Sequence, residues 1–92
     1  MTSTETQPDT PSRIDDAFVQ SLIEFISDEV AHDDDTIFED TDLLLTGQVD
    51  SLGVVIVVGW LEEQLDIRID PLDVVLENFQ TVGQMAEYLR RR

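Results

Sequence analysis

The stretch TDLLLTGQVDSLG (residues 41–53) contains the change from loop to helix on which the fold of this chain depends. Its three successive leucines (residues 43–45) are too apolar for a freely solvated loop, and so is Phe38 shortly before them. We therefore expect the long connection from Asp33 to Asp50 to fold back over part of the core. Gly47 allows a turn near the end of this connection.

A helix is expected to begin at Ser51, directly after the connection, with Asp50 as its N-cap. Five successive residues of this segment are Val or Ile, which suit a buried strand about as well as a helix. The length of the segment, up to Leu65, and its polar end favour the helix. Gly53 and Gly59 weaken that helix by about 1 kcal/mol each relative to alanine.

Three further segments have the apolar spacing of amphipathic helices. They run from about Ile14 to His32, ended by three aspartates (residues 33–35), from Pro71 to Asn78, and from Val82 to about Arg90 behind a Thr81 cap. The apolar positions expected to anchor them are Ile14, Phe18, Leu22, Phe25, Ile26 and Val30 in the first, Leu72, Val75 and Leu76 in the second, and Val82, Met85, Ala86 and Leu89 in the third.

These segments predict an all-α fold, a small four-helix bundle with three longer helices and one short third helix. Residues 13–92 form one domain in this prediction, and residues 1–12, which contain almost nothing apolar, form a disordered tail.

The composition excludes several classes of function. Asp and Glu total 21 against 5 Lys and Arg, for a net charge of -16, which would repel nucleic acid and anionic membranes. Attraction to basic protein partners and solubility alone explain this charge equally well. Without cysteine there is no disulfide or zinc-thiolate site. The polar start is unlike a signal peptide, and the longest apolar run (residues 52–61) is too short to span a bilayer, so we expect a cytoplasmic monomer.

A serine in the first turn of a helix lies beside backbone N–H groups that have no helical partner and favour a phosphate. Ser51 has this position, with Asp50 next to it. Taken alone, helix capping is the commoner explanation of an Asp-Ser pair.

Other candidates for chemistry are weaker. His32 is the only histidine and stands at an expected helix end, where an exposed or capping role is more common than a catalytic one. Val49 replaces the first glycine of a Gly-x-Ser-x-Gly nucleophile motif. The three aspartates at residues 33–35 lack the spacing of a calcium loop. We therefore expect no catalytic residue and no metal. Trp60 falls between the two helix faces, and we expect it at the edge of the core rather than on a docking surface.

The segment 41–53, together with DTDL (residues 40–43), LEEQLDIRI (residues 61–69) and FQTV (residues 79–82), resembles acyl and peptidyl carrier proteins. The resemblance covers about residues 14–88. It implies that a phosphopantetheinyl transferase moves 4'-phosphopantetheine from coenzyme A to Ser51, with Asp50 as a contact of the transferase. It also implies a discrete carrier, not an enzyme, that holds an acyl or aminoacyl thioester in biosynthesis, as in polyketide or peptide pathways. Its partners would be a loading enzyme and a downstream transferase or synthase.

One face of the second helix departs from the family's fatty-acid members, which usually carry an acidic residue where this chain has Ile56. Helical spacing places Leu52, Val55, Ile56 and Gly59 on one side and Val54, Val57, Val58, Leu61 and Leu65 on the other. We expect the first set to form an apolar partner-binding surface, with Glu62 and Glu63 as its charged rim. The alternative is a rotated helix that buries Ile56.

Two questions stay open from the sequence. Gly53 and the apolar helix resemble carriers that load amino acids, but the cargo is not decided. An acidic helical adaptor that binds a basic protein without any modification is the alternative function.

Overall fold

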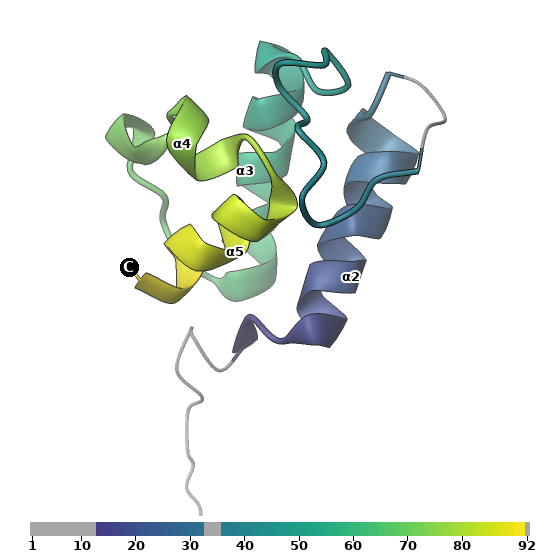
Figure 1. The fold of residues 1–92 in the computed structure, drawn as a ribbon. Coiled ribbons are helices and arrows are strands. Elements are labelled where there is room, and N and C mark those ends of the chain that lie inside the picture. Colours follow the sequence, from purple (N-terminus) through teal and green to yellow (C-terminus); the bar gives the residue numbers. More distant parts are fainter. Residues whose placement is uncertain (1–12, 33–35, 92) are drawn as a thin grey trace, which may run out of the picture.

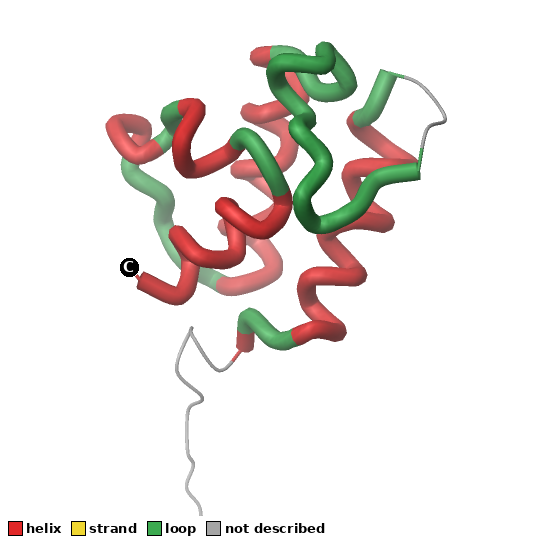
Figure 2. Tube along the Cα trace, in the orientation of Figure 1, coloured by secondary structure: helices red, strands yellow, loops and turns green. Residues whose placement is uncertain are grey.

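The computed structural model describes residues 13–32 and 36–91, and every regular element within these two ranges is helical. In chain order the elements are α2 (Asp16–Phe25), the π-helical turn η1 (Ile26–Val30), α3 (Ser51–Leu65), the 3-10 turn η2 (Pro71–Asp73), α4 (Leu76–Phe79) and α5 (Val82–Arg91). Figure 2 shows these helices joined by loops. The predicted all-α bundle is confirmed, while the predicted tail at residues 1–12 lies outside the described residues.

The first long helix consists of α2 and its continuation η1. The carboxylate of Asp15 caps α2 by accepting a hydrogen bond of 2.9 Å from the N–H of Phe18. The N–H of Ala31 bonds to the carbonyl of Ile26 at 2.7 Å, and Ala31 itself is extended. The helix therefore ends at Val30, before the predicted end at His32, and the aspartates expected to end it lie outside the described residues.

Helix α3 has 15 residues and is about 22 Å long. Its buried stripe consists of Gly53, Val57, Leu61 and Leu65. Val54 and Val58 are half-buried, whereas Ile56 is 42% exposed. The helix thus exposes the predicted face, and the alternative of a rotated helix that buries Ile56 is wrong. Asp66, at φ 54°, ends the helix in the left-handed region.

The connection before α3 covers the core with fewer side chains than predicted. Leu43 is fully buried, but Phe38 and Leu45 are 62% and 72% exposed, so their predicted place over the core is wrong. Backbone hydrogen bonds hold the connection instead. The N–H of Leu43 donates to the carbonyl of Gln80, and the N–H of Gly83 donates to the carbonyl of Glu39. Figure 1 shows the connection passing α5 on its way to the start of α3.

The predicted third helix, Pro71–Asn78, is interrupted. Val74 and Val75 leave the helical conformation, since Val75 is extended at φ -129° and ψ 162°, as β-branched residues favour. The segment therefore divides into η2 and α4, and its buried anchor is Phe79. The predicted anchors Leu72, Val75 and Leu76 are all exposed, Leu72 to 83%, so that prediction is wrong.

The remaining core follows the predicted pattern. Helix α5 buries Val82, Met85, Ala86 and Leu89, and Thr81 caps it by accepting the N–H of Gln84 at 3.0 Å. Trp60 stacks on Phe25 with ring centroids 4.8 Å apart, at the edge of the core as expected. Within the described residues, no helix combines the length and the apolarity needed to cross a lipid bilayer.

Two arginines bind backbone carbonyls at the end of the bundle that lies opposite the start of α3. The guanidinium of Arg13 donates to the carbonyls of Gln64 and Leu65, both at 2.8 Å, at the carboxyl end of α3. Arg90 donates to the carbonyl of Ile14. Both contacts satisfy backbone carbonyls, and those of Arg13 lie where the helix dipole favours a cation.

The first turn of α3 packs directly against η1 and the preceding loop. A Cβ atom at Gly53 would lie 2.8 Å from Cγ1 of Val30 and 2.9 Å from Cγ1 of Val49, which is too close for either contact. A Cβ atom at Gly59 would meet nothing within 4 Å. Glycine is therefore required by packing at position 53 and not at position 59.

We expect Gly53→Ala to lower the free energy of unfolding by about 1–2 kcal/mol, because overpacking outweighs the gain of about 1 kcal/mol in helix propensity. The matched variant Gly59→Ala should raise the stability by about 0.5–1 kcal/mol, since only the propensity changes. Urea unfolding of the three proteins measures both effects. A stabilised Gly53→Ala protein would contradict the close packing of α3 on η1.

Candidate functional site

Ser51 is the first residue of α3, and its side chain is exposed. The loop that precedes it is fixed, because the N–H of Val49 bonds to the carbonyl of Leu43 at 3.0 Å and Gly47 makes the expected turn at φ 80°. The serine hydroxyl is therefore held at a constant place on the surface. The backbone N–H groups of the first helical turn lie beside it.

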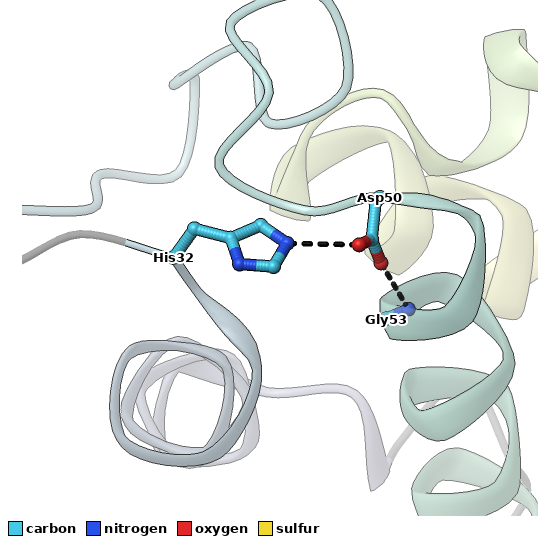
Figure 3. Close-up of polar contacts among 3 residues, drawn as sticks. All are labelled: His32, Asp50 and Gly53. Atoms are coloured by element: carbon cyan, nitrogen blue, oxygen red, sulfur yellow. Dashed lines mark hydrogen bonds and ion pairs between the residues drawn. The ribbon is translucent and has the colours of Figure 1, made fainter.

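Asp50 is the N-cap of α3, as predicted, and both of its carboxylate oxygens are bonded. Oδ1 accepts the N–H of Gly53 at 2.8 Å, and Oδ2 lies 2.9 Å from Nε2 of His32 (Figure 3). The hydrogen bond from Gly53, followed by the one from His32, lowers the pKa of Asp50 below its ordinary value of 3.8. The carboxylate is thus held ionised and in one orientation.

The contact between His32 and Asp50 is the feature of this site that sequence reasoning missed. The two residues are 18 positions apart, and no periodic pattern links them. The prediction that His32 is exposed is confirmed, although the helix ends before it at Val30, and its ring nitrogen contacts the carboxylate of the N-cap. Since Nε2 is bonded to Asp50, this pairing gives no support to a Ser-His-acid triad.

An apolar groove of about 290 Å³ begins at Ser51. One wall is α3 and the other is the segment 74–79, so Val75 and Leu76, which were predicted to lie in the core, line a surface hollow instead. A second hollow of about 740 Å³ continues along α3 and shares Val55 and Val74 with the first. The first groove is lined by Leu44, Ser51, Val54, Val55, Val74, Val75, Leu76 and Phe79.

The predicted partner face of α3 is exposed along its apolar part, at Leu52, Val55, Ile56 and Gly59. Of its two predicted rim residues, Glu63 is exposed. Glu62 is half-buried, and its Oε2 accepts the N–H of Ile69 at 2.8 Å. Glu62 therefore holds the segment after α3, a structural role that the sequence did not indicate. Within residues 13–32 and 36–91, no three His, Cys, Asp or Glu side chains gather in a way that could hold a metal ion.

The pKa of Asp50 in the folded protein lies below its ordinary value of 3.8, so the ionised carboxylate stabilises the fold. This stabilisation is fully present above pH 3.8 and is lost as the pH falls through the lower pKa of the folded protein. Asp50→Asn keeps a capping side chain but has no carboxylate. We expect wild type to exceed this variant in stability at neutral pH and the difference to shrink as the pH falls below 3.8. Urea unfolding at neutral and at acidic pH measures it, with Asp15→Asn as a control for loss of one charge at a cap. A difference that is constant with pH contradicts the role of the carboxylate.

A comparison with protein families matches residues 20–89 to the phosphopantetheine attachment site family. The matched range includes Asp50, Ser51 and the groove beside them, and it covers more than half of the chain. Comparisons with curated proteins and with solved structures gave no match. The helical fold and the family match agree with the resemblance to carrier proteins. The chain therefore belongs to the phosphopantetheine attachment site family, whose members carry covalently attached 4'-phosphopantetheine.

Proposed function

We propose that Ser51 is the attachment site of 4'-phosphopantetheine and that the protein presents an acyl or aminoacyl group to biosynthetic enzymes. The observation that carries this proposal is the exposed Ser51 hydroxyl at the start of a 15-residue helix, after a loop held by backbone hydrogen bonds. When bound, the arm supplies the terminal thiol on which the cargo is held as a thioester. Without cysteine, the chain has no competing thiol.

The residues around Ser51 fit a phosphodiester. The first-turn N–H groups and the positive end of the dipole of α3 favour a phosphate at this position. Asp50 is the nearest negative charge in the sequence, but its carboxylate is turned to Gly53 and His32. The apolar groove that begins at Ser51 gives a pantetheine chain or an apolar cargo a surface to lie against.

The proposed partner surface lies on the same helix. Between Asp50 and Glu62, α3 carries no charged residue, and Leu52, Val55, Ile56 and Gly59 are exposed there. An enzyme that approaches Ser51 along α3 meets apolar side chains first and Glu63 at the far end. The net charge of -16 would speed the encounter with a basic partner, while the apolar contact would set specificity.

The protein itself is not proposed to catalyse a reaction. A carrier domain is not itself catalytic, and His32, the only histidine, contacts Asp50. The proposed partners are a phosphopantetheinyl transferase, a loading enzyme and a downstream transferase or synthase. Each must reach the same exposed start of α3.

Intact-mass measurement after incubation with coenzyme A and a broad-range phosphopantetheinyl transferase tests the attachment site. We expect wild type to gain the mass of one phosphopantetheinyl group and Ser51→Ala to gain none. Ser21→Ala, which removes an exposed hydroxyl from α2, is the matched control and should be modified like wild type. An unmodified wild type would favour the alternative of an acidic adaptor, and a modified Ser51→Ala would place the site elsewhere.

The partner surface is tested by Ile56→Glu, which introduces a charge at an exposed position of α3. We expect kcat/KM for transfer to or from a partner enzyme to fall about tenfold or more, because burying the new carboxylate in an apolar contact is unfavourable. Gln20→Glu adds the same charge on α2 and should leave the transfer unchanged. Circular dichroism should show the same helical content in all three proteins. A large loss of helix in Ile56→Glu, or transfer at the wild-type rate, would contradict the proposed surface.

A further inference from the structure

His32 contacts the end of the loop before α3 through two different groups. Its backbone N–H donates to the carbonyl of Gln48 at 2.9 Å, and its Nε2 lies 2.9 Å from Oδ2 of Asp50. Oδ1 of the same carboxylate is bonded to the N–H of Gly53. Figure 3 shows the carboxylate between these two groups. Asp50 therefore cannot rotate about its side-chain bonds without losing one of them.

The orientation of Asp50 matters because Ser51 is its direct neighbour. A carboxylate free to turn toward the serine hydroxyl would face an incoming phosphate with a like charge. Held by Gly53 and His32, the carboxylate stays in the capping position, where it takes the N–H of Gly53 and leaves the N–H groups of Ser51 and Leu52 to the phosphate. This contact needs a proton on Nε2, which is present in the charged imidazole and in the Nε2–H tautomer of the neutral one.

Arg13 and Arg90, which bond to backbone carbonyls, lie too far away to take the place of His32. Arg13 bonds to the carboxyl end of α3, about 22 Å from Ser51 by the length of the helix. That separation exceeds two Debye lengths of about 8 Å at physiological salt, so its charge is largely screened. Arg90 bonds to the carbonyl of Ile14, near the opposite end of the first helix from His32. His32 thus places a basic side chain at the start of α3, where it is bonded to Asp50.

We propose that His32 is a positioning residue for the attachment of phosphopantetheine to Ser51 and that it acts by holding the carboxylate of Asp50. This inference rests on the proposed function of Ser51. In the attachment, Oγ of Ser51 forms a bond to the pantetheine-side phosphorus of coenzyme A. The phosphoanhydride bond breaks, adenosine 3',5'-bisphosphate leaves, and the hydroxyl proton passes to a base of the transferase. His32 takes no part in these bond changes.

The test compares wild type with His32→Phe, which keeps a ring without a donor, and His32→Gln, which places an N–H donor near the position of Nε2. Each protein is modified by a broad-range phosphopantetheinyl transferase with coenzyme A under initial-rate conditions. We expect kcat/KM for the Phe variant to fall about 3- to 10-fold, as for loss of one hydrogen bond. The Gln variant should remain within about twofold of wild type.

A second readout separates positioning from a general loss of structure. The carboxyl carbon of Asp50, observed by NMR, should titrate at higher pH in His32→Phe than in wild type, because the bond from His32 contributes to its lowered pKa. In His32→Gln the titration should stay close to that of wild type. This measurement needs no transferase and remains valid if the Phe variant is less stable.

The outcomes distinguish the two proposals. Wild type modified at Ser51 and His32→Phe modified equally fast would overturn the role of His32 and leave the attachment site intact. Equal losses of kcat/KM in the Phe and Gln variants, or an unchanged titration of Asp50 in the Phe variant, would also overturn the role of His32. Either result would show that the hydrogen bond from His32 to Asp50 does not determine the rate of modification. Wild type that is not modified at all would overturn the function of Ser51 and this inference together.

Discussion

The first turn of α3 lies so close to Val30 and Val49 that residue 53 has no room for a Cβ atom. Gly53 costs the helix about 1 kcal/mol in propensity, yet it allows the end of η1 to pack against the start of α3. Val30 is two residues before His32, so this packing also brings the imidazole within 2.9 Å of Asp50. The geometry around Ser51 therefore depends on a close contact of the α3 backbone with the side chains of Val30 and Val49, which glycine at position 53 permits.

One face of α3 belongs to the core, and the opposite face is the proposed partner surface. One face buries Val57, Leu61 and Leu65, and the opposite face leaves an apolar surface exposed next to Ser51. In a chain with a net charge of -16, such an uncharged surface stands out against its surroundings. It lies on the helix that begins at the proposed attachment site, so the proposed modification and the proposed partner surface share one helix.

The segment after α3 illustrates how local preferences and tertiary packing compete. Apolar spacing predicted one short helix from Pro71 to Asn78, but the two valines at 74 and 75 leave the helical conformation and the chain divides into two turns. Asp70 caps the first turn through the N–H of Leu72, and Tyr88 donates to the carboxylate of Asp73 at 2.8 Å. Val75 and Leu76, which were predicted to lie in the core, line the groove beside Ser51.

Local interactions explain what the sequence by itself determined. The caps at Asp50 and Thr81 each join a side chain to an N–H three residues later, and the rotation of α3 follows from the spacing of its apolar residues. These features depend on neighbours within one or two helical turns, so they can be recognised in the sequence. The acidic charge and the motif around Ser51 were equally visible, and the family match agrees with the carrier resemblance that the motif carries.

Only the tertiary structure decided which distant residues meet. The contact of His32 with Asp50 spans 18 residues and that of Arg13 with Leu65 spans 52, and neither leaves a periodic signal in the sequence. The exposure of Phe38 was likewise decided by how the connection lies across the bundle and not by its hydrophobicity. Such contacts depend on how whole helices pack, because the pairing of two segments is set by the shapes that the rest of the chain leaves between them.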